Sequence, residues 1–312
     1  NFPVVQQTIN LDKKFSFETQ NTAGSYNLMS SYNAIGGKLG KFSYYAYNHS
    51  RSGDGWRENS GYKVRNTHLF MEYAFTENTK LSAEYTNMEY EIQQAGGLTD
   101  AQFQENPRQS LRNRNWFGVP WNVFALNFDT KVSERFSSNT KLFGLVGERN
   151  SVGFTATPNV ADAINPATND YANRRVDRDL YENFGLENRN LWKYQLGKME
   201  NNLAFGVRLY QAHTIRKQSG VGTTGSDFDL STESKFPREL SFYTNNVAIF
   251  AENQFKITDQ FSVTPGVRYE FIENTGSGRF GIQSGNDVPF EDKNISRSKA
   301  LFGLGMEYSF GT

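Results

Sequence analysis

The sequence predicts an all-β fold, a transmembrane antiparallel up-and-down β-barrel of about twelve strands, on three observations. Several segments alternate strictly between apolar and polar residues, as half-buried strands do. The connections between these segments alternate between long and short, as expected for the extracellular loops and periplasmic turns of a membrane barrel. Aromatic residues make up 15% of a chain whose apolar fraction is only 37% and whose mean hydropathy is −0.66.

The composition of the 312 residues excludes several other classes of protein. No apolar run approaches the roughly 18 residues of a membrane helix, so a helical membrane protein is excluded. A disordered chain would be poor in aromatics, whereas this one has 26 Phe and 16 Tyr. Lys plus Arg and Asp plus Glu both total 33, so no basic excess indicates a nucleic-acid partner.

The predicted strands follow one another along the chain without a competing amphipathic helix. The clearest alternation is in Phe302–Phe310, where Phe302, Leu304, Met306, Tyr308 and Phe310 share one face. Taken in order, the twelve strands are predicted at residues 14–23, 26–35, 41–49, 67–75, 80–91, 124–130, 138–149, 178–192, 202–210, 240–256, 261–271 and 302–310.

The strand at 261–271, F-S-V-T-P-G-V-R-Y-E-F, contains a proline where a central strand should not tolerate one. Pro265 removes one backbone donor from the sheet. It stands five residues after the preceding short turn, near the predicted periplasmic rim. We therefore expect a local break in pairing at Pro265–Gly266, absorbed by a β-bulge.

The connections carry the second signal. Those predicted to be short are Thr76–Thr79, Ser133–Ser137, Gly197–Asn201 and Ile257–Gln260, and those predicted to be long are 50–65, 92–120, 150–177, 214–239 and 272–298. A transmembrane barrel places all its long loops at one end. A β-sandwich has no reason to do so, and the blade repeat of a propeller is absent.

Charged residues fill the alternate positions of several predicted strands. Facing lipid they would be very costly, but in a wet barrel interior they can be hydrated or paired. The residues expected on this inner face are Arg208, Glu252, Arg268, Glu270 and Glu307.

Three motifs in register resemble TonB-dependent outer-membrane receptors of the ferric-citrate type. The segments Gly53–Ser60 (GDGWRENS) and Ala95–Phe103 (AGGLTDAQF) are similar to the first extracellular loops of that family. Val263–Glu270 (VTPGVRYE) is similar to one of its mid-barrel strands. Order and spacing match over most of the chain, from about residue 1 to 310.

The resemblance implies that residues 1–312 are part of the transmembrane barrel of such a receptor. The family has an N-terminal plug domain and a 22-stranded barrel. Asn1-Phe2 resembles the end of the plug, so the chain is expected to be the first half of the barrel. The aromatic-ending segment Gly305–Phe310 keeps open the alternative of a complete twelve-stranded barrel, a passive porin or structural protein without a specific ligand.

The function implied by the resemblance is import of a ferric chelate, such as ferric citrate or another siderophore complex. Its expected place is the outer membrane of a Gram-negative bacterium. The implied partners are the chelate, the TonB complex acting through the plug, and outer-membrane lipid and lipopolysaccharide, with no nucleic acid and no resident cofactor.

Arginines in two long loops are the candidate ligand-binding residues. Guanidinium groups bind carboxylates through paired hydrogen bonds and stay charged, which suits a carboxylate-rich anionic chelate. The candidates are Arg108, Gln109, Arg112, Arg114, Arg175 and Arg178, and Arg112 is the best match to the family's ligand arginines. The segment Gly185–Arg189 resembles one that follows a second ligand arginine in the family. The residues just before it in this sequence are Asn183 and Phe184 instead of Arg. Arg175 and Asp177 could instead pair to stiffen a loop.

The sequence shows only weak catalytic and metal-binding patterns, so we expect that the protein is not an enzyme. His49, His68 and His213 lie on or beside separate predicted strands, and none has the H-x-x-x-H or H-E-x-x-H spacing of a metal site. The sequence contains no Cys, which removes thiol catalysis, disulfides and Cys-based metal sites. Binding rather than catalysis is the predicted chemistry.

Overall fold

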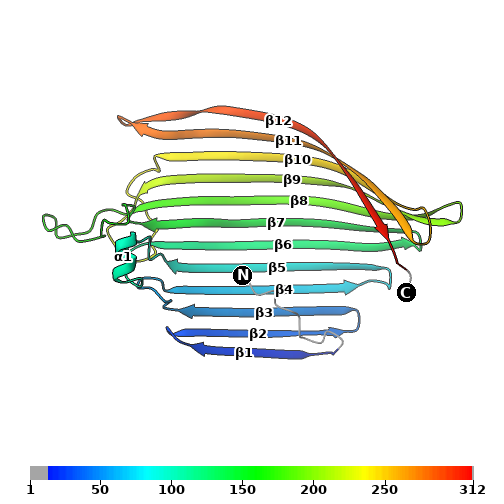
Figure 1. Ribbon diagram of the computed structural model, residues 1–312, viewed down its shortest axis with the longest axis horizontal. Coiled ribbons are helices and arrows are strands. Elements are labelled where there is room, and N and C mark those ends of the chain that lie inside the picture. The colour runs from blue at the N-terminus through cyan, green and yellow to red at the C-terminus, as the bar shows by residue number, and fades with distance from the viewer. Residues whose placement is uncertain (1–12, 311–312) are drawn as a thin grey trace.

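In the computed structural model, which describes residues 13–310, twelve strands form one antiparallel sheet (Figure 1). Each strand pairs with its neighbours in the sequence, in the order β1 to β12. The strands are β1 (Ser16–Gly24), β2 (Leu28–Leu39), β3 (Phe42–Gly53), β4 (Tyr62–Ala74), β5 (Thr79–Gln93), β6 (Trp116–Ser133), β7 (Phe136–Gly153), β8 (Arg175–Leu196), β9 (Met199–Val221), β10 (Arg238–Lys256), β11 (Phe261–Gln283) and β12 (Asn286–Tyr308). The predicted up-and-down β fold is confirmed.

All twelve predicted strands are present, and most are longer than predicted. The largest error is at 272–298, predicted as a long loop. There β11 and β12 continue to a two-residue turn at Ser284-Gly285. The segment 92–120 is also shorter as a loop, because β6 begins at Trp116 and because the loop contains a short helix, α1 (Asp100–Glu105). The short turns lie where they were predicted.

Midway along the strands the sheet has one apolar face and one mainly polar and charged face, as the strand registers show residue by residue. One row of directly opposed residues across β4 to β11 is entirely apolar: Met71, Ala83, Leu126, Leu142, Leu186, Leu209, Val247 and Phe271. Its large members are 38–48% exposed. In a transmembrane barrel such a belt faces lipid.

The next residue along each strand belongs to the opposite face. There the opposed residues are Glu72, Ser82, Asn127, Lys141, Glu187, Arg208, Ala248, Glu270 and Lys299. Arg268 and Glu270 lie on this face as predicted and form an ion pair of 2.6 Å. The charged face is the interior of the barrel.

The prediction for Pro265 is half right. Its pairing with β12 is continuous, but pairing with β10 lapses between Glu252↔Gly266 and Phe255↔Val263. The lapse covers Thr264–Pro265, whereas Gly266 is paired on both sides. The register is the same before and after the gap, so the predicted bulge is absent. The missing N–H of Pro265 therefore interrupts pairing with β10 at Thr264 and Pro265, while pairing with β12 is unaffected.

Pro120 in β6 behaves in the same way. Pairing with β5 runs through Glu89↔Pro120, while pairing with β7 stops at Gly118↔Asn150 and resumes at Trp121↔Gly147. The register again does not shift at this gap. Both prolines in the sheet interior thus turn their ring nitrogen toward one neighbour and leave the other ladder intact.

Within the described residues, β1 and β12 do not pair with each other and form the two edges of the sheet (Figure 1). A closed twelve-stranded barrel would join them. Nearly every residue of β12 is exposed, on both faces. α1, the helix of the described part of the chain, is too short to span a membrane. The resemblance of Asn1-Phe2 to a plug end lies outside the described residues.

Candidate functional site

The long connections gather at one end of the sheet, where α1 also lies (Figure 1). They are the loops 54–61, 94–115, 154–174 and 222–237, which we call the loop cluster. Antiparallel neighbours place every second connection at the same end, so this arrangement follows directly from the strand order. The loop cluster contains the predicted ligand-binding arginines Arg108, Arg112 and Arg114, whereas Arg175 and Arg178 lie at the start of β8.

The first two family-like motifs are bound to each other. From the GDGWRENS segment, Arg57 donates to the carbonyl oxygens of Gly96 and Gln109, both at 2.7 Å. Ser60 Oγ lies within hydrogen-bond distance of the Arg57 carbonyl oxygen, at 2.5 Å, which closes the first loop on itself. One loop therefore holds the other in place.

Glycines with positive φ allow this close approach. Gly55 has φ +76°, and a Cβ there would meet Ser60 Oγ at 2.3 Å. Gly96 has φ +73°, and a Cβ there would lie 2.7 Å from Cγ of Arg112. Both positions exclude larger residues on conformation and on space.

α1 follows directly in the second motif. Thr99 caps its first turn, and the side chain of Gln102 accepts from the backbone N–H of Thr99 at 2.8 Å, which completes a capping box. Gln109, a predicted site residue, donates to the Gln102 carbonyl at 2.6 Å. Gln109 thus ties the following chain to this helix.

Arg112 is buried and binds backbone carbonyls of the next loop. Its guanidinium donates to Val160 at 2.6 Å, Ala156 at 2.8 Å and Thr157 at 2.9 Å, and it lies over the Phe154 ring at 5.2 Å. The sequence placed Arg112 correctly in a loop but gave no hint of these partners. Its donors are occupied by the 154–174 loop.

Arg114 is completely buried and joins three loops. It forms a paired interaction with Asp162 at 2.8 and 2.7 Å, and donates to the carbonyls of Ala172 and Thr224. The Tyr171 ring lies 4.1 Å from its guanidinium carbon. The contacts of Arg114 thus connect the loops 94–115, 154–174 and 222–237.

A third buried arginine, Arg174, lies beside Arg114 and was not among the predicted site residues. It donates to the Asp227 carbonyl at 2.6 Å and to the Arg114 carbonyl at 3.3 Å. Burial, and next the charge of Arg114, lower the pKa of Arg174. We call Arg114, Asp162 and Arg174 the loop knot.

The other three predicted arginines lie apart from one another. Arg108 is exposed and donates to the Trp56 carbonyl at 2.9 Å. Arg175 pairs with Asp177 at 3.0 Å, the arrangement that the sequence allowed as an alternative. Arg178 pairs with Glu148 at 2.7 Å, on the face that carries the apolar belt.

A different group of charges lies on the interior face next to the loop cluster. Asp179, only 7% exposed, is shared by Arg149 at 3.6 Å and Arg216 at 3.1 Å, from the two neighbouring strands. The arginine side chains are 56% and 42% exposed. Two half-exposed guanidinium groups around one buried carboxylate leave an excess positive charge and free donors.

Aromatic rings extend this group. The guanidinium of Arg149 lies 5.8 Å from the ring centre of Phe117, which lies 6.0 Å from that of Tyr90. We call Tyr90, Phe117, Arg149, Asp179 and Arg216 the inner arginine cluster. Sequence reasoning missed it because Arg216 fell in a predicted loop, although the spacing from Arg208 would have placed both on one face.

Further along the same strands, a cavity of about 470 Å³ opens on the interior face. Glu187, 8% exposed, contacts Arg189 and lies 3.8 Å from Arg208. Buried Nε of Arg208 and Oδ1 of Asn183 have no hydrogen-bond partner. The arrangement again surrounds one carboxylate with arginine, here at membrane depth.

The three histidines are not brought together. His49 contacts Ser30, His68 contacts Thr86, and His213 stacks on Tyr243 with ring centres 4.0 Å apart. Among residues 13–310, no group of three or more His, Asp or Glu side chains is placed to hold a metal ion.

The sequence and the fold were compared with known protein families and solved structures. Residues 168–310 match the family model described as TonB dependent receptor-like, beta-barrel. The chain is similar to the unliganded ferric citrate transporter FecA, at 19% identity and TM-score 0.77, over 97% of this chain and 43% of that one. It is also similar to the ferric-catecholate import receptor Fiu of E. coli K12, at 10% identity and TM-score 0.74, over 95% and 52% of the two chains.

A third similar structure is P. aeruginosa FpvA in an iron complex with a heterologous pyoverdine, at 13% identity and TM-score 0.76, over 95% of this chain and 40% of that one. The chain thus spans about half the length, or less, of these structures. At such identities the likeness establishes the fold. Residues 168–310 match the TonB-dependent receptor-like β-barrel, within a sheet that has the fold of these three structures.

Proposed function

We propose that the chain contributes its twelve strands to the barrel of a Gram-negative outer-membrane receptor that imports an anionic ferric chelate, such as ferric citrate, energised through TonB. The inner arginine cluster is the observation that carries the proposal. It lies on the face that a barrel turns inward, at the end where the loops gather. An incoming chelate therefore meets it directly after the loops.

The chemistry of the cluster suits a carboxylate-rich anion. The buried Asp179 holds Arg149 and Arg216 in fixed positions, so less side-chain entropy is lost when a ligand binds. Asp179 neutralises only one of the two guanidinium charges, so a carboxylate group of the ligand would neutralise the other. Phe117 and Tyr90 supply an apolar edge beside it.

The loop residues retain a part in the proposal. Arg108 and Arg175 are exposed and can reach a ligand as they stand, whereas Arg178, Arg112 and Arg114 would first have to leave protein partners. We therefore propose that Arg112, Arg114 and Gln109 act by holding the loop cluster in shape around the ligand. Binding of TonB through a plug domain and contact with lipopolysaccharide are parts of the same proposal.

The test is titration of ferric citrate into the purified receptor, followed by calorimetry and Trp fluorescence. Arg149→Gln combined with Arg216→Gln should weaken binding about a hundredfold or more, because two charge-assisted hydrogen bonds of roughly 1.5–3 kcal/mol each are lost. Arg135→Gln, at an exposed arginine in the β6–β7 turn at the other end of the sheet, is the matched control and should bind as the wild type does.

Two results would count against the proposal. If the double variant binds ferric citrate as tightly as the wild type, the inner arginine cluster is not the site. If neither ferric citrate nor another ferric chelate binds the wild type, the alternative of a passive porin without a specific ligand is favoured.

A further inference from the structure

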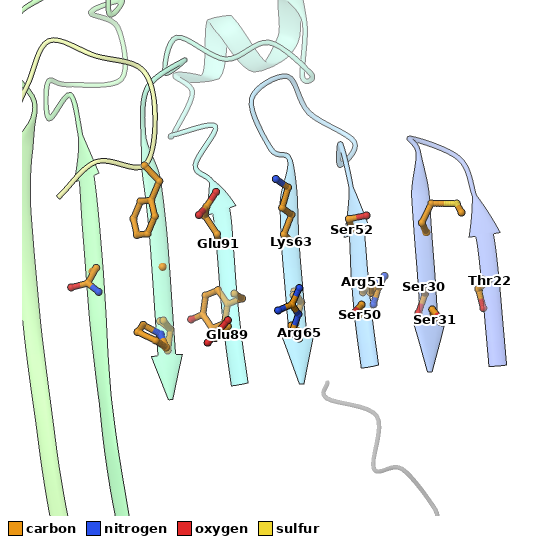
Figure 2. Close-up of a pocket in the computed structure, with 18 of the residues that line it drawn as sticks. Thr22, Ser30, Ser31, Ser50, Arg51, Ser52, Lys63, Arg65, Glu89 and Glu91 are labelled. Atoms are coloured by element: carbon orange, nitrogen blue, oxygen red, sulfur yellow. The ribbon is translucent and has the colours of Figure 1, made fainter. Parts of the chain in front are cut away.

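A cavity of about 900 Å³ near the loop end of β1 to β7 opens on the lipid-facing side of the sheet. Figure 2 shows Lys63 and Arg65 of β4 and Glu89 and Glu91 of β5 in its lining. Lys63 and Arg65 are separated from Met71 of the apolar belt by an even number of residues, so all three point to the same side of β4. The interior face at this end of the sheet carries a different set of side chains.

A row of aromatic side chains lies directly beneath the inner arginine cluster on the interior face. Tyr181 is two residues from Asp179 on β8, and Phe242 is two residues from Leu240, which is opposite Arg216. Two residues along a strand cover about 7 Å and return to the same face. The aromatic row is therefore about 7 Å further from the loops than the arginines.

Trp121 and Tyr181 form the first aromatic pair, over Gly147 of β7. They are opposite Gly147 from the two neighbouring strands, with ring centres 6.1 Å apart. A Cβ at Gly147 would lie 3.1 Å from Cδ1 of Trp121, so the indole uses the space that the glycine leaves. The indole N–H is buried and has no hydrogen-bond partner among the described residues. A buried donor in this state is stabilised by any ligand that supplies an acceptor.

Phe242 and Phe290 form the second aromatic pair, over Gly276 of β11. Their ring centres are 6.5 Å apart, and a Cβ at Gly276 would lie 3.2 Å from each ring. Phe280 adds a third ring, 5.0 Å from that of Phe290, and is 48% exposed. The second pair therefore ends in an apolar surface that the described chain leaves uncovered.

The two aromatic pairs leave a gap over Thr214 of β9. Thr214 is opposite Tyr181 on one side and opposite Phe242 on the other. Neighbouring strands are about 4.8 Å apart, so roughly 10 Å separates these two aromatic residues at the backbone. A flat ring over Thr214 would thus lie about 5 Å from each of them, within the roughly 4.5–7 Å at which aromatic rings pack. We call this gap the ring slot.

Arg216 lies at the loop end of the ring slot. It is two residues from Thr214 on the same face of β9, and its side chain is 42% exposed. A ligand with an anionic oxygen next to an aromatic ring can place the oxygen at Arg216 and the ring in the slot. Citrate has no ring, so ferric citrate would use the arginines and leave the ring slot empty.

We propose that the chelate taken by the inner arginine cluster carries an aromatic ring, which lies in the ring slot between Tyr181 and Phe242. A carboxylate or phenolate oxygen beside the ring accepts from Arg216, and the indole N–H of Trp121 donates to a further oxygen of the chelate. This inference rests on the proposed import of an anionic chelate and narrows its substrate class to aryl-bearing ferric chelates.

The experiment compares two ferric complexes whose chelators differ only in a ring. The purified receptor is titrated in a calorimeter with the ferric complex of 3-phenyllactate and with that of lactate, each with excess chelator and against a blank of the iron-free acid. Both chelators are 2-hydroxycarboxylates, so both offer the same groups to iron and to the arginines. The phenyllactate complex should bind about tenfold more tightly or better, because it adds ring contacts on two sides.

Two changes in the ring slot test where the preference comes from. Tyr181→Leu combined with Phe242→Leu keeps apolar packing but removes both flat faces, and should bring the two complexes to within about threefold of each other. Thr214→Phe fills the slot with a ring of the protein and should remove the preference as well. Both variants should bind the lactate complex as the wild type does.

The matched control is Tyr85→Leu combined with Phe124→Leu. This pair is also one Tyr and one Phe on directly opposed positions, but it lies on the lipid-facing side. It should keep the preference of the wild type for the phenyllactate complex.

The outcomes separate this inference from the proposed function. Equal affinity of the wild type for the two complexes, or a preference unchanged in both ring-slot variants, would overturn the ring slot and leave import of an anionic chelate standing. A ring-slot variant that lost both complexes equally would also count against it, since the effect would not be specific to the ring. If the wild type bound neither these complexes nor ferric citrate, the proposed function itself would fail.

Discussion

Arg114 shows how a residue that looks like a ligand contact can be a structural one. Its donors are used by Asp162 and by carbonyls from two other loops, and it is fully buried. The sequence could place it in a loop and count its charge. It could not supply the partners, because those lie 48 to 111 residues away in the chain.

Arg114→Ala should disorder the loop cluster. It leaves the carboxylate of Asp162 buried without its cation, and breaking a buried pair in this way costs about 3–5 kcal/mol. Hydrogen exchange in 154–174 and 222–237 should accelerate, while the strands keep their protection. Arg175→Ala breaks an exposed pair worth about 0–1 kcal/mol and should leave both loops unchanged. Equal effects of the two variants would show that the loop knot does not order these loops.

Gly96→Ala tests the contact between the first two motifs. The left-handed conformation costs a non-glycine residue roughly 1–2 kcal/mol, and the new methyl group would also displace Arg112. We expect faster proteolysis of the 94–115 loop. Gly281→Ala, where the added atom meets nothing within 4 Å, is the control and should be neutral. A neutral Gly96→Ala would mean that the loop tolerates another backbone path.

At the scale of elements, the sequence predicted strands best where lipid is expected. Alternation of apolar and polar residues requires one face to meet hydrocarbon, as in Phe261–Phe271. Beyond the belt the apolar residues of β11 and β12, such as Phe280 and Val288, are few and irregularly spaced, so the 272–298 segment gave no strand signal. The inner arginine cluster was missed for the same reason, because two of its strands extend past the predicted ends.

The β11–β12 hairpin should respond to its turn residues. Ser284 and Gly285 have φ of 51° and 78°, as in the two-residue turns that favour Asn-Gly. Ser284→Asn should slow amide exchange in residues 279–290, and Gly285→Val should accelerate it, because a β-branched residue resists positive φ. Identical exchange in both variants would show that the flanking pairing, and not the turn, holds the hairpin together.

At the scale of the whole molecule, the two faces define how the sheet meets its surroundings. Leu142 belongs to the apolar belt, and Leu145, three residues along the same strand, points to the interior. Leu142→Arg should lower the free energy of unfolding in lipid vesicles by about 2–4 kcal/mol, and Leu145→Arg by much less. Urea titration of the refolded protein measures both. Reversed effects would mean that the faces have been assigned the wrong way round.

The hydrogen bonds from Arg57 to the 94–115 loop limit which loop segments can be exchanged between barrels of this fold. The guanidinium of Arg57 donates to the carbonyls of Gly96 and Gln109, and Gly96 packs against the side chain of Arg112. The segments 54–61 and 94–115 therefore form one structural unit. Grafting either loop alone onto a related barrel leaves its partner without support. Chimeras with altered recognition should therefore exchange the two segments together.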